Sequence, residues 1–244
     1  MNETERRRAI QRQLLGMEAK ASGCGALATG FAAVDAALGG GFRRGGITEV
    51  YGPASCGKTA FVLQAIAHGQ SCGASAAWID AEHAFDPKFA AQLGVDVSQI
   101  PVAAPETAEE ALEVARRFAS SGAVDLVAID SAAALVPRLE LETAIGETGA
   151  GLQGRVLMSE LRRLAQAAAR SGAAIVLLNQ TRFRPGEGET SSGGPSIKLY
   201  STLRIALSAS GRRVRFRVVK NKFSKPFGEA ILEWQRGGGF AEPR

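Results

Sequence analysis

The chain has 244 residues, of which 45% are hydrophobic, and a net charge of +5 at pH 7. This length and composition support one sizeable core with short appendages. The three widely spaced cysteines argue against a disulfide framework, no run is apolar enough to span a bilayer, and no secretory leader is evident. We therefore expect a cytoplasmic location without membrane contact.

The first 25 residues are predicted to be separate from the core. Residues 2–20 have the spacing of an amphipathic helix, with Ile10, Leu14 and Met17 on one stripe, and residues 21–25 are typical of a linker. A helix this short is only marginally stable alone, so its stripe should pack on its own domain or on a neighbouring subunit. The expected division is an N-terminal helix and linker, 1–25, and a core domain, 26–244.

The segment Gly52–Thr59 matches the phosphate-loop pattern of nucleoside-triphosphate-binding proteins at every fixed position. It follows a predicted strand, 47–51, and leads into a predicted helix that begins at Thr59, continues through Ala60 and ends at Ile66. Its glycines let the backbone surround phosphate oxygens, and Lys58 would reach the β- and γ-phosphates while the Thr59 hydroxyl ligates Mg²⁺. The candidate nucleotide-binding residues are Gly52, Pro53, Ala54, Ser55, Cys56, Gly57, Lys58 and Thr59.

Beyond residue 47, short apolar runs alternate with helical patterns, which predicts an α/β fold with a mainly parallel central sheet flanked by helices. The predicted buried strands are 76–80, 124–130 and 174–179, and the predicted helices are 108–120 and 157–170. Runs 203–207 and 214–219 alternate more, as strands with one wet face do. The Gly- and Ser-rich segment 185–194 is predicted to be a mobile loop.

Polar side chains follow three of the buried strands and should meet at one edge of the sheet. Asp130 is the natural partner of Thr59 for Mg²⁺, although an aspartate at a strand end also commonly caps a helix. Asp80 and Glu82 both follow strand 76–80, and spacing alone does not decide which would activate water. Gln180 could sense a γ-phosphate or simply end its strand.

Basic residues are concentrated towards the C-terminus. Between residues 190 and 228 there are nine lysines and arginines and no acidic residue. Such asymmetry is typical of a surface that binds a polyanion, and a solvated basic edge is the alternative.

Together these motifs resemble the ATPase core of the bacterial RecA recombinase family, from about Thr29 to Phe227. The segments that carry the resemblance are GPASCGKT at 52–59, WIDAEHAFDP at 78–87, SGAVDLVAIDSAAALVP at 121–137, LLNQTR at 177–182, SSGG at 191–194 and VVKNK at 218–222. The second and the last are far more specific than a phosphate loop alone. The resemblance implies a RecA-type P-loop NTPase core that uses ATP and Mg²⁺.

The resemblance also implies a catalytic set. Glu82 is similar to the water-activating glutamate, and Gln180 to the sensor that couples ATP to the second DNA loop. Lys220 and Lys222 are similar to lysines that reach the γ-phosphate bound by a neighbouring subunit. With Lys58, these residues form the expected catalytic group.

Contacts to adenine and to DNA are implied in the same way. Asp86 and Phe89 stand where an aspartate and an aromatic residue hold adenine in the family. The implied DNA-contacting positions are Arg155 and Arg162 in the first loop region, and Arg182, Arg184, Gly193 and Gly194 in the second. Arginines would hold phosphates, and glycine backbone N–H groups would approach the strand closely.

The chain departs from the family pattern at several places. The second loop is shorter and lacks its apolar insert, and the first carries Gly149 and Ala150 in place of a bulky wedge. Met158 replaces a DNA-contacting serine, and Leu199 replaces a phenylalanine that relays the ATP state. The family's C-terminal domain has no counterpart in this sequence. These differences weaken the features on which strand exchange depends.

Two functions therefore remain open. The leading one is a Mg²⁺- and DNA-dependent ATPase that binds single-stranded DNA as a nucleotide-controlled homo-oligomer or filament in homologous recombination and DNA repair. The alternative is an accessory interaction module of SOS mutagenesis or translesion repair, similar to the ImuA type, which partners a full-length RecA without strand exchange of its own. The trimmed loops favour the second function, and the complete hydrolytic set favours the first.

Overall fold

The computed structural model of the protein describes residues 25–143, 152–184 and 188–243. The predicted N-terminal helix lies outside these ranges. The described strands are β1 (Ala26–Leu27), β2 (Phe42–Arg43), β3 (Ile47–Gly52), β4 (Ala76–Asp80), β5 (Val102–Ala103), β6 (Leu126–Asp130), β7 (Ala174–Arg184), β8 (Gly188–Ser191), β9 (Ser201–Ser210), β10 (Arg213–Asn221), β11 (Glu229–Trp234) and β12 (Phe240–Ala241). The described helices are α2 (Ala32–Leu38), α3 (Lys58–Ser71), α4 (Pro87–Gln92), α5 (Ala108–Ser121), the 3-10 helix η1 (Ala132–Ala134), α6 (Arg138–Glu142), α7 (Leu152–Ser171) and α8 (Pro195–Tyr200).

A ten-stranded mixed sheet forms the centre of the molecule. Its order is β12-β11-β10-β9-β3-β7-β6-β4-β5, and β8 pairs with β7 off this path. Neighbouring strands from β9 to β5 are parallel, whereas β10, β11 and β12 continue the sheet in antiparallel fashion. The predicted α/β class with a mainly parallel central sheet is confirmed.

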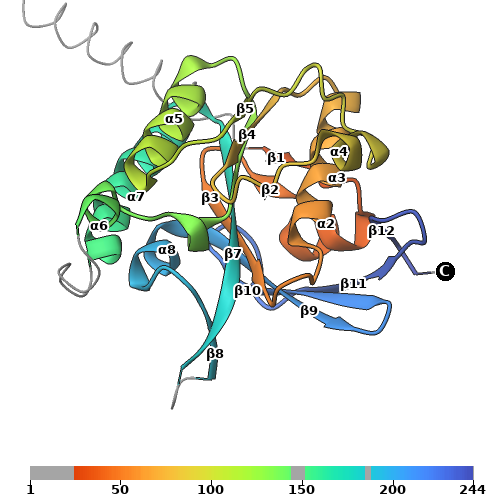
Figure 1. The fold of residues 1–244 in the computed structure, drawn as a ribbon. Helices are drawn as coiled ribbons and strands as arrows, with labels where there is room; N and C mark the ends of the chain where they lie inside the picture. The colour runs from red at the N-terminus through yellow and green to blue at the C-terminus, as the bar shows by residue number, and fades with distance from the viewer. Residues whose placement is uncertain (1–24, 144–151, 185–187, 244) are drawn as a thin grey trace, which may run out of the picture.

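Helices cover both faces of this sheet: α2, α3 and α4 lie on one side, and α5 and α7 lie on the other (Figure 1). Successive side chains of a strand point to opposite faces. In β7, Val176 and Leu178 therefore join the apolar cluster around α3, while Ile175 and Leu177 join the cluster under α5 and α7. Burial on both faces explains why this strand is an unbroken apolar run in the sequence.

The structure corrects part of the predicted loop 185–194, because residues 188–191 form strand β8. Strand β7 continues to Arg184, and β8 pairs with it in antiparallel register from Thr181↔Ser191 to Arg184↔Gly188. This β7–β8 hairpin projects from the body of the molecule (Figure 1). Backbone pairing with a long neighbouring strand outweighs the weak strand preference of a Gly- and Ser-rich segment.

The two more alternating runs also form strands, and each is longer than predicted. Strand β9 buries every second residue over most of its length, and β10 does the same in its first half. One face of this part of the sheet is therefore open, as the alternation indicated. Among the described helices, none is both long and apolar enough to cross a membrane.

Candidate functional site

The segment Gly52–Thr59 connects the carboxyl end of β3 to the start of α3. Gly57 has a φ of 93°, and a Cβ on it would lie 2.3 Å from a ring carbon of Phe240. A Cβ on Gly52 would lie 2.6 Å from the carbonyl oxygen of Leu207. Both positions therefore require glycine, one for its backbone conformation and both for space.

Lys58 is the first residue of α3 and is buried. Its Nζ donates hydrogen bonds to the carbonyl oxygens of Pro53 at 2.7 Å and Gly52 at 3.1 Å. The ammonium group is thus held against the first two residues of the loop. Cys56 is also buried, and burial raises the pKa of its thiol, which keeps it protonated and favours a packing role over a reactive one.

Thr59 and Asp130 meet where α3 begins and β6 ends. The Thr59 hydroxyl donates a hydrogen bond of 2.8 Å to Oδ2 of Asp130. Burial raises the pKa of Asp130 to about 6; the bond from Thr59 opposes this rise and the charge of Glu82 adds to it. Adjacent hydroxyl and carboxylate oxygens are donors that suit Mg²⁺, whose positive charge would favour the ionised form of Asp130. These residues therefore fit the expected cation.

Glu82 lies just beyond β4 and receives hydrogen bonds from the ends of two neighbouring strands. The buried Ser131, after β6, donates its hydroxyl to Oε1 of Glu82, and Nε2 of Gln180, in β7, donates to the same oxygen at 3.4 Å. Oε2 has no contact of this kind among the described residues. The predicted meeting of polar groups at this sheet edge is thus found, and Ser131 is a member that sequence reasoning missed.

Asp80 has a structural role. The spacing alone did not decide between Asp80 and Glu82 as the residue that would activate water. Its two carboxylate oxygens accept the backbone N–H groups of Ala84 at 3.0 Å and Phe85 at 2.9 Å. Asp80 therefore shapes the turn after β4, and of these two acids only Glu82 keeps an oxygen without a hydrogen bond from the described residues.

The two residues expected near adenine take part in local structure. Asp86 caps α4, because its Oδ1 accepts the backbone N–H groups of Lys88 and Phe89. The Phe89 ring lies so close to Gly238 that a Cβ there would be 3.2 Å from it. Their contact with a nucleotide base stays a prediction.

Two aromatic side chains beside the phosphate loop were not expected from the sequence. Phe240 and Trp234 have ring centroids 4.3 Å apart, and both rings lie within 3 Å of where a Cβ on Gly57 would be. They come from β12 and β11, beyond the segment in which the motifs lie. The only sequence signal was an aromatic residue on each side of the turn with three glycines, 237–239.

Lys220 and Lys222 lie away from the phosphate loop of their own chain. Lys220 Nζ donates to the carbonyl oxygen of Lys198 at 2.6 Å, and burial, followed by the charge of Lys222, lowers its pKa. The backbone N–H of Lys222 donates to Thr202, next to the Ile47 end of β3, whereas the loop leaves β3 at its other end. At about 3.3 Å per residue, the two ends of β3 are roughly 17 Å apart.

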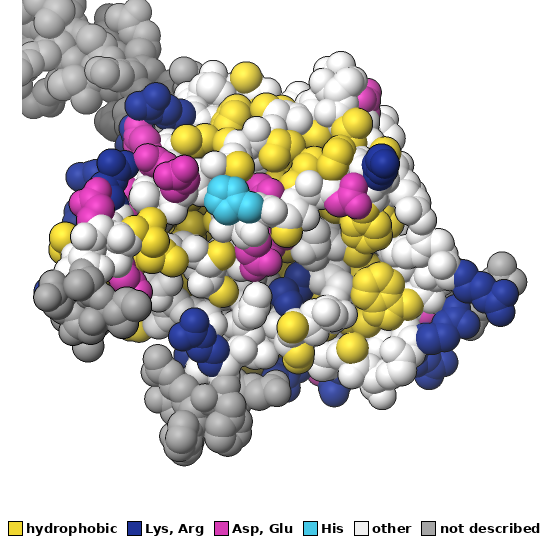
Figure 2. Space-filling model, in the orientation of Figure 1, with side chains coloured by type: hydrophobic (Ala, Val, Ile, Leu, Met, Phe, Trp, Pro, Cys, Tyr) yellow, Lys and Arg dark blue, Asp and Glu magenta, His cyan; other side chains and the backbone are white. Residues whose placement is uncertain are grey.

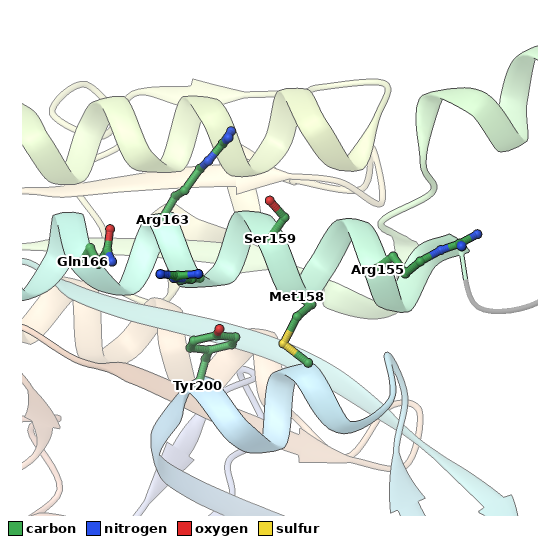
Figure 3. Close-up of a pocket in the computed structure, with 7 residues that line it drawn as sticks. Arg155, Met158, Ser159, Arg163, Gln166 and Tyr200 are labelled. Carbon is green, nitrogen blue, oxygen red and sulfur yellow. The ribbon is translucent and has the colours of Figure 1, made fainter.

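The expected DNA-contacting arginines lie on α7 and on the β7–β8 hairpin. Arg155 and Arg162 line an open pocket of about 560 Å³ together with Met158, Ser159, Arg163, Gln166 and Tyr200. Figure 3 shows Tyr200 pointing from α8 towards α7 and Met158 pointing towards α8, while Arg163 points away. Arg182 is exposed on the hairpin.

Gly193 and Gly194 follow the hairpin with φ of 79° and 73°. Residues 149 and 150 lie outside the described ranges, and the side chain of Arg184 is likewise outside them. Figure 2 shows lysine and arginine side chains at the far end of the sheet near the C-terminus and, interspersed with acidic side chains, along the margin formed by α5 and α7.

The comparisons with known proteins agree on one family. A family model described as RecA N-terminal domain matches residues 7–241. Protein RecA of Frankia alni is 43% identical over 231 residues, which cover 88% of this chain and 67% of that protein. Protein RecA of Mycobacteroides abscessus is 44% identical over 229 residues, 88% of this chain and 66% of that protein. The chain thus spans about two thirds of the length of these relatives, and it belongs to the RecA family.

Proposed function

We propose that this protein is a Mg²⁺-dependent ATPase that binds single-stranded DNA as a nucleotide-controlled oligomer in homologous recombination and DNA repair. The observation that carries the proposal is the meeting of Lys58, the Thr59–Asp130 pair and the Glu82–Gln180 pair at one sheet edge. Lys58 and Thr59 come from the phosphate loop, and Asp130, Glu82 and Gln180 lie in or just beyond three other strands. A chance phosphate-loop pattern would not bring them together.

The residues divide the chemistry of hydrolysis among them. Lys58 and the loop N–H groups would hold the β- and γ-phosphates, and Thr59 with Asp130 would hold Mg²⁺, which neutralises charge on those phosphates. Glu82 would accept the proton of the attacking water through Oε2, because Oε1 already receives hydrogen bonds from Ser131 and Gln180. Gln180 would sense the γ-phosphate from the same side.

The position of the lysines supports the proposed oligomer. Lys222 lies at the end of β3 opposite the phosphate loop, so it can assist hydrolysis only at a site on another copy of the chain. Arg155, Arg162 and Arg182 would bind DNA phosphates from two exposed elements. The relatives described above carry the name RecA, which gives the accessory-module alternative no support.

The test is ATP turnover with and without single-stranded DNA, in wild type and in Glu82→Gln. We expect DNA to stimulate turnover, and Glu82→Gln to lower it by about 100-fold or more while the nucleotide still binds, because a general base contributes about that much. Glu233→Gln, a surface substitution on β11, is the matched control and should change neither quantity.

Salt-dependent binding to single-stranded DNA completes the test. Affinity should fall steeply with salt and should rise with a non-hydrolysable ATP analogue. If turnover is the same without DNA and in Glu82→Gln, the proposed mechanism is wrong. If DNA does not bind even at low salt while a full-length RecA is retained in pull-downs, the accessory function takes its place.

A further inference from the structure

A buried ion pair lies between the proposed nucleotide site and the β7–β8 hairpin. Glu49 in β3 is fully buried, and its Oε2 accepts a hydrogen bond from Nε of Arg204 in β9. The Arg204 side chain is only 13% exposed, and its guanidinium group lies 4.8 Å from the ring centre of Tyr51. Removing such charges from water is costly unless every polar atom finds a partner. Other polar atoms of this pair do find partners, on two sides.

In one direction the pair reaches Gln180. Oε1 of Glu49 accepts a hydrogen bond of 2.8 Å from Nδ2 of Asn179, which is fully buried in β7. Oδ1 of Asn179 accepts the backbone N–H of Gln180 at 2.9 Å. Gln180 in turn carries the amide that donates to Glu82. The carboxylate of Glu49 thus fixes the rotamer of the residue that holds the Gln180 backbone.

In the other direction the pair reaches the hairpin. A terminal nitrogen of Arg204 donates to the hydroxyl of Ser191, the last residue of β8, at 3.0 Å. Nδ2 of Asn179 also donates to the carbonyl oxygen of Ser192 at 3.0 Å, and the N–H of Ser192 donates to the carbonyl oxygen of Gln180 at 2.9 Å. Arg204 therefore bonds directly to the end of β8, and Glu49 is linked to the same segment through Asn179.

We propose that the Glu49–Arg204 pair is a positioning device that holds Gln180 and the β7–β8 hairpin in one fixed relation. Because Arg204 bonds to Glu49 and Ser191 through different nitrogens of one planar group, a shift of the hairpin displaces the pair, and the pair displaces Asn179 and Gln180. A lysine at 204 would keep the charge but would lack this fork. The inference deepens the proposed function and rests on it, because Gln180 matters here through its place beside Glu82.

Arg204→Lys and Ser191→Ala are the two test variants. The matched control is Arg213→Lys, which changes an exposed arginine paired with Glu233 on the same sheet. Each is compared with wild type in affinity for a non-hydrolysable ATP analogue, in turnover with and without saturating single-stranded DNA, and in amide hydrogen exchange of residues 180–192.

We expect Arg204→Lys to leave nucleotide affinity nearly unchanged and to lower the ratio of DNA-stimulated to basal turnover about tenfold or more, since small misplacements of catalytic groups have effects of this size. Amide exchange in residues 180–192 should accelerate. Ser191→Ala should change both quantities in the same direction but less. The double variant should behave like Arg204→Lys alone, because the bond to Ser191 is already lost.

The proposal is overturned if Arg204→Lys keeps the wild-type ratio of DNA-stimulated to basal turnover. It is also overturned if the variant lowers both turnover rates in proportion without faster amide exchange in residues 180–192. Should Arg204→Lys fail to fold, Ser191→Ala is the test variant. A wild-type ratio of DNA-stimulated to basal turnover in Ser191→Ala would then overturn the proposal. A wild type without DNA-stimulated turnover would refute the proposed function instead, and the exchange measurement would still test the link between the pair and the hairpin.

Discussion

At the scale of single residues, carboxylate groups with the same chemistry have different roles in the site. Asp80 uses both carboxylate oxygens on backbone N–H groups, whereas Glu82, two residues later, keeps one oxygen free. Asp130 accepts the Thr59 hydroxyl, and burial raises the pKa of its carboxyl to about 6. A group held in this way has consequences for stability as well as for chemistry.

Asp130→Asn should stabilise the protein at neutral pH. The folded pKa of about 6 lies above the usual 3.8, so the folded state binds more protons between these values and Asp130 lowers the free energy of unfolding as pH rises through that window. At pH 8 the variant should gain up to roughly 3 kcal/mol, from about 1.4 kcal/mol per unit of pKa, and at pH 4 almost nothing. Denaturant unfolding at the two pH values measures this.

Asp125→Asn is the control, because its effect on the free energy of unfolding should have the opposite sign. Partial burial disfavours its charge, but the N–H of Ser75 and the Arg44 guanidinium outweigh burial and hold the pKa of Asp125 below its usual range. Loss of that carboxylate should therefore destabilise the protein at pH 8. If both substitutions shift stability in the same direction, the assigned protonation of Asp130 is wrong.

At the scale of elements, α7 presents arginines to a surface shared with α8. Arg155 and Arg162 line the same pocket as Tyr200, and both residues are exposed. Arg163, by contrast, is paired with Glu160 at 3.1 Å. The first two are therefore better suited than the third to neutralise a polyanion.

Arg155→Ala and Arg162→Ala should each weaken binding of single-stranded DNA and reduce the salt slope of log K by about one unit, because each removes one phosphate contact. Arg170→Ala, at the other end of the same helix, is the control and should leave the slope unchanged. Fluorescence titration at several salt concentrations gives the slopes. Equal slopes in all variants would place the DNA elsewhere.

Some elements could be predicted from the sequence, and others could not. Strand β4 coincides with its predicted range, since Ala76–Asp80 is apolar on both sides and ends in functional acids. The β7–β8 hairpin was missed because β8 lies in a segment of weak strand preference and its pairing depends on β7 continuing past the sheet. Ser131, Trp234 and Phe240 were missed because their roles come from neighbours distant in the chain, which composition and periodicity do not reveal.

At the scale of the whole molecule, the proposed site needs groups from both ends of β3, and one copy supplies only one end to each interface. Lys222→Ala and Glu82→Gln should each be inactive alone, but mixed in equal amounts they should recover about a quarter of wild-type turnover, because about a quarter of the interfaces then combine an intact Glu82 with an intact Lys222. Turnover of the mixture that merely averages the two variants would rule out a shared site.

In the proposed oligomer, the separation of Lys222 from the phosphate loop along β3 would also set how activity scales with assembly size. Two surfaces at opposite ends of a strand produce a head-to-tail contact, which does not close unless the rotation between copies happens to form a ring. In an open row, the subunit at one end has no neighbour to complete its cleft, so each row has one working site fewer than it has subunits. Short rows are then poor catalysts, and turnover per subunit reports the average row length.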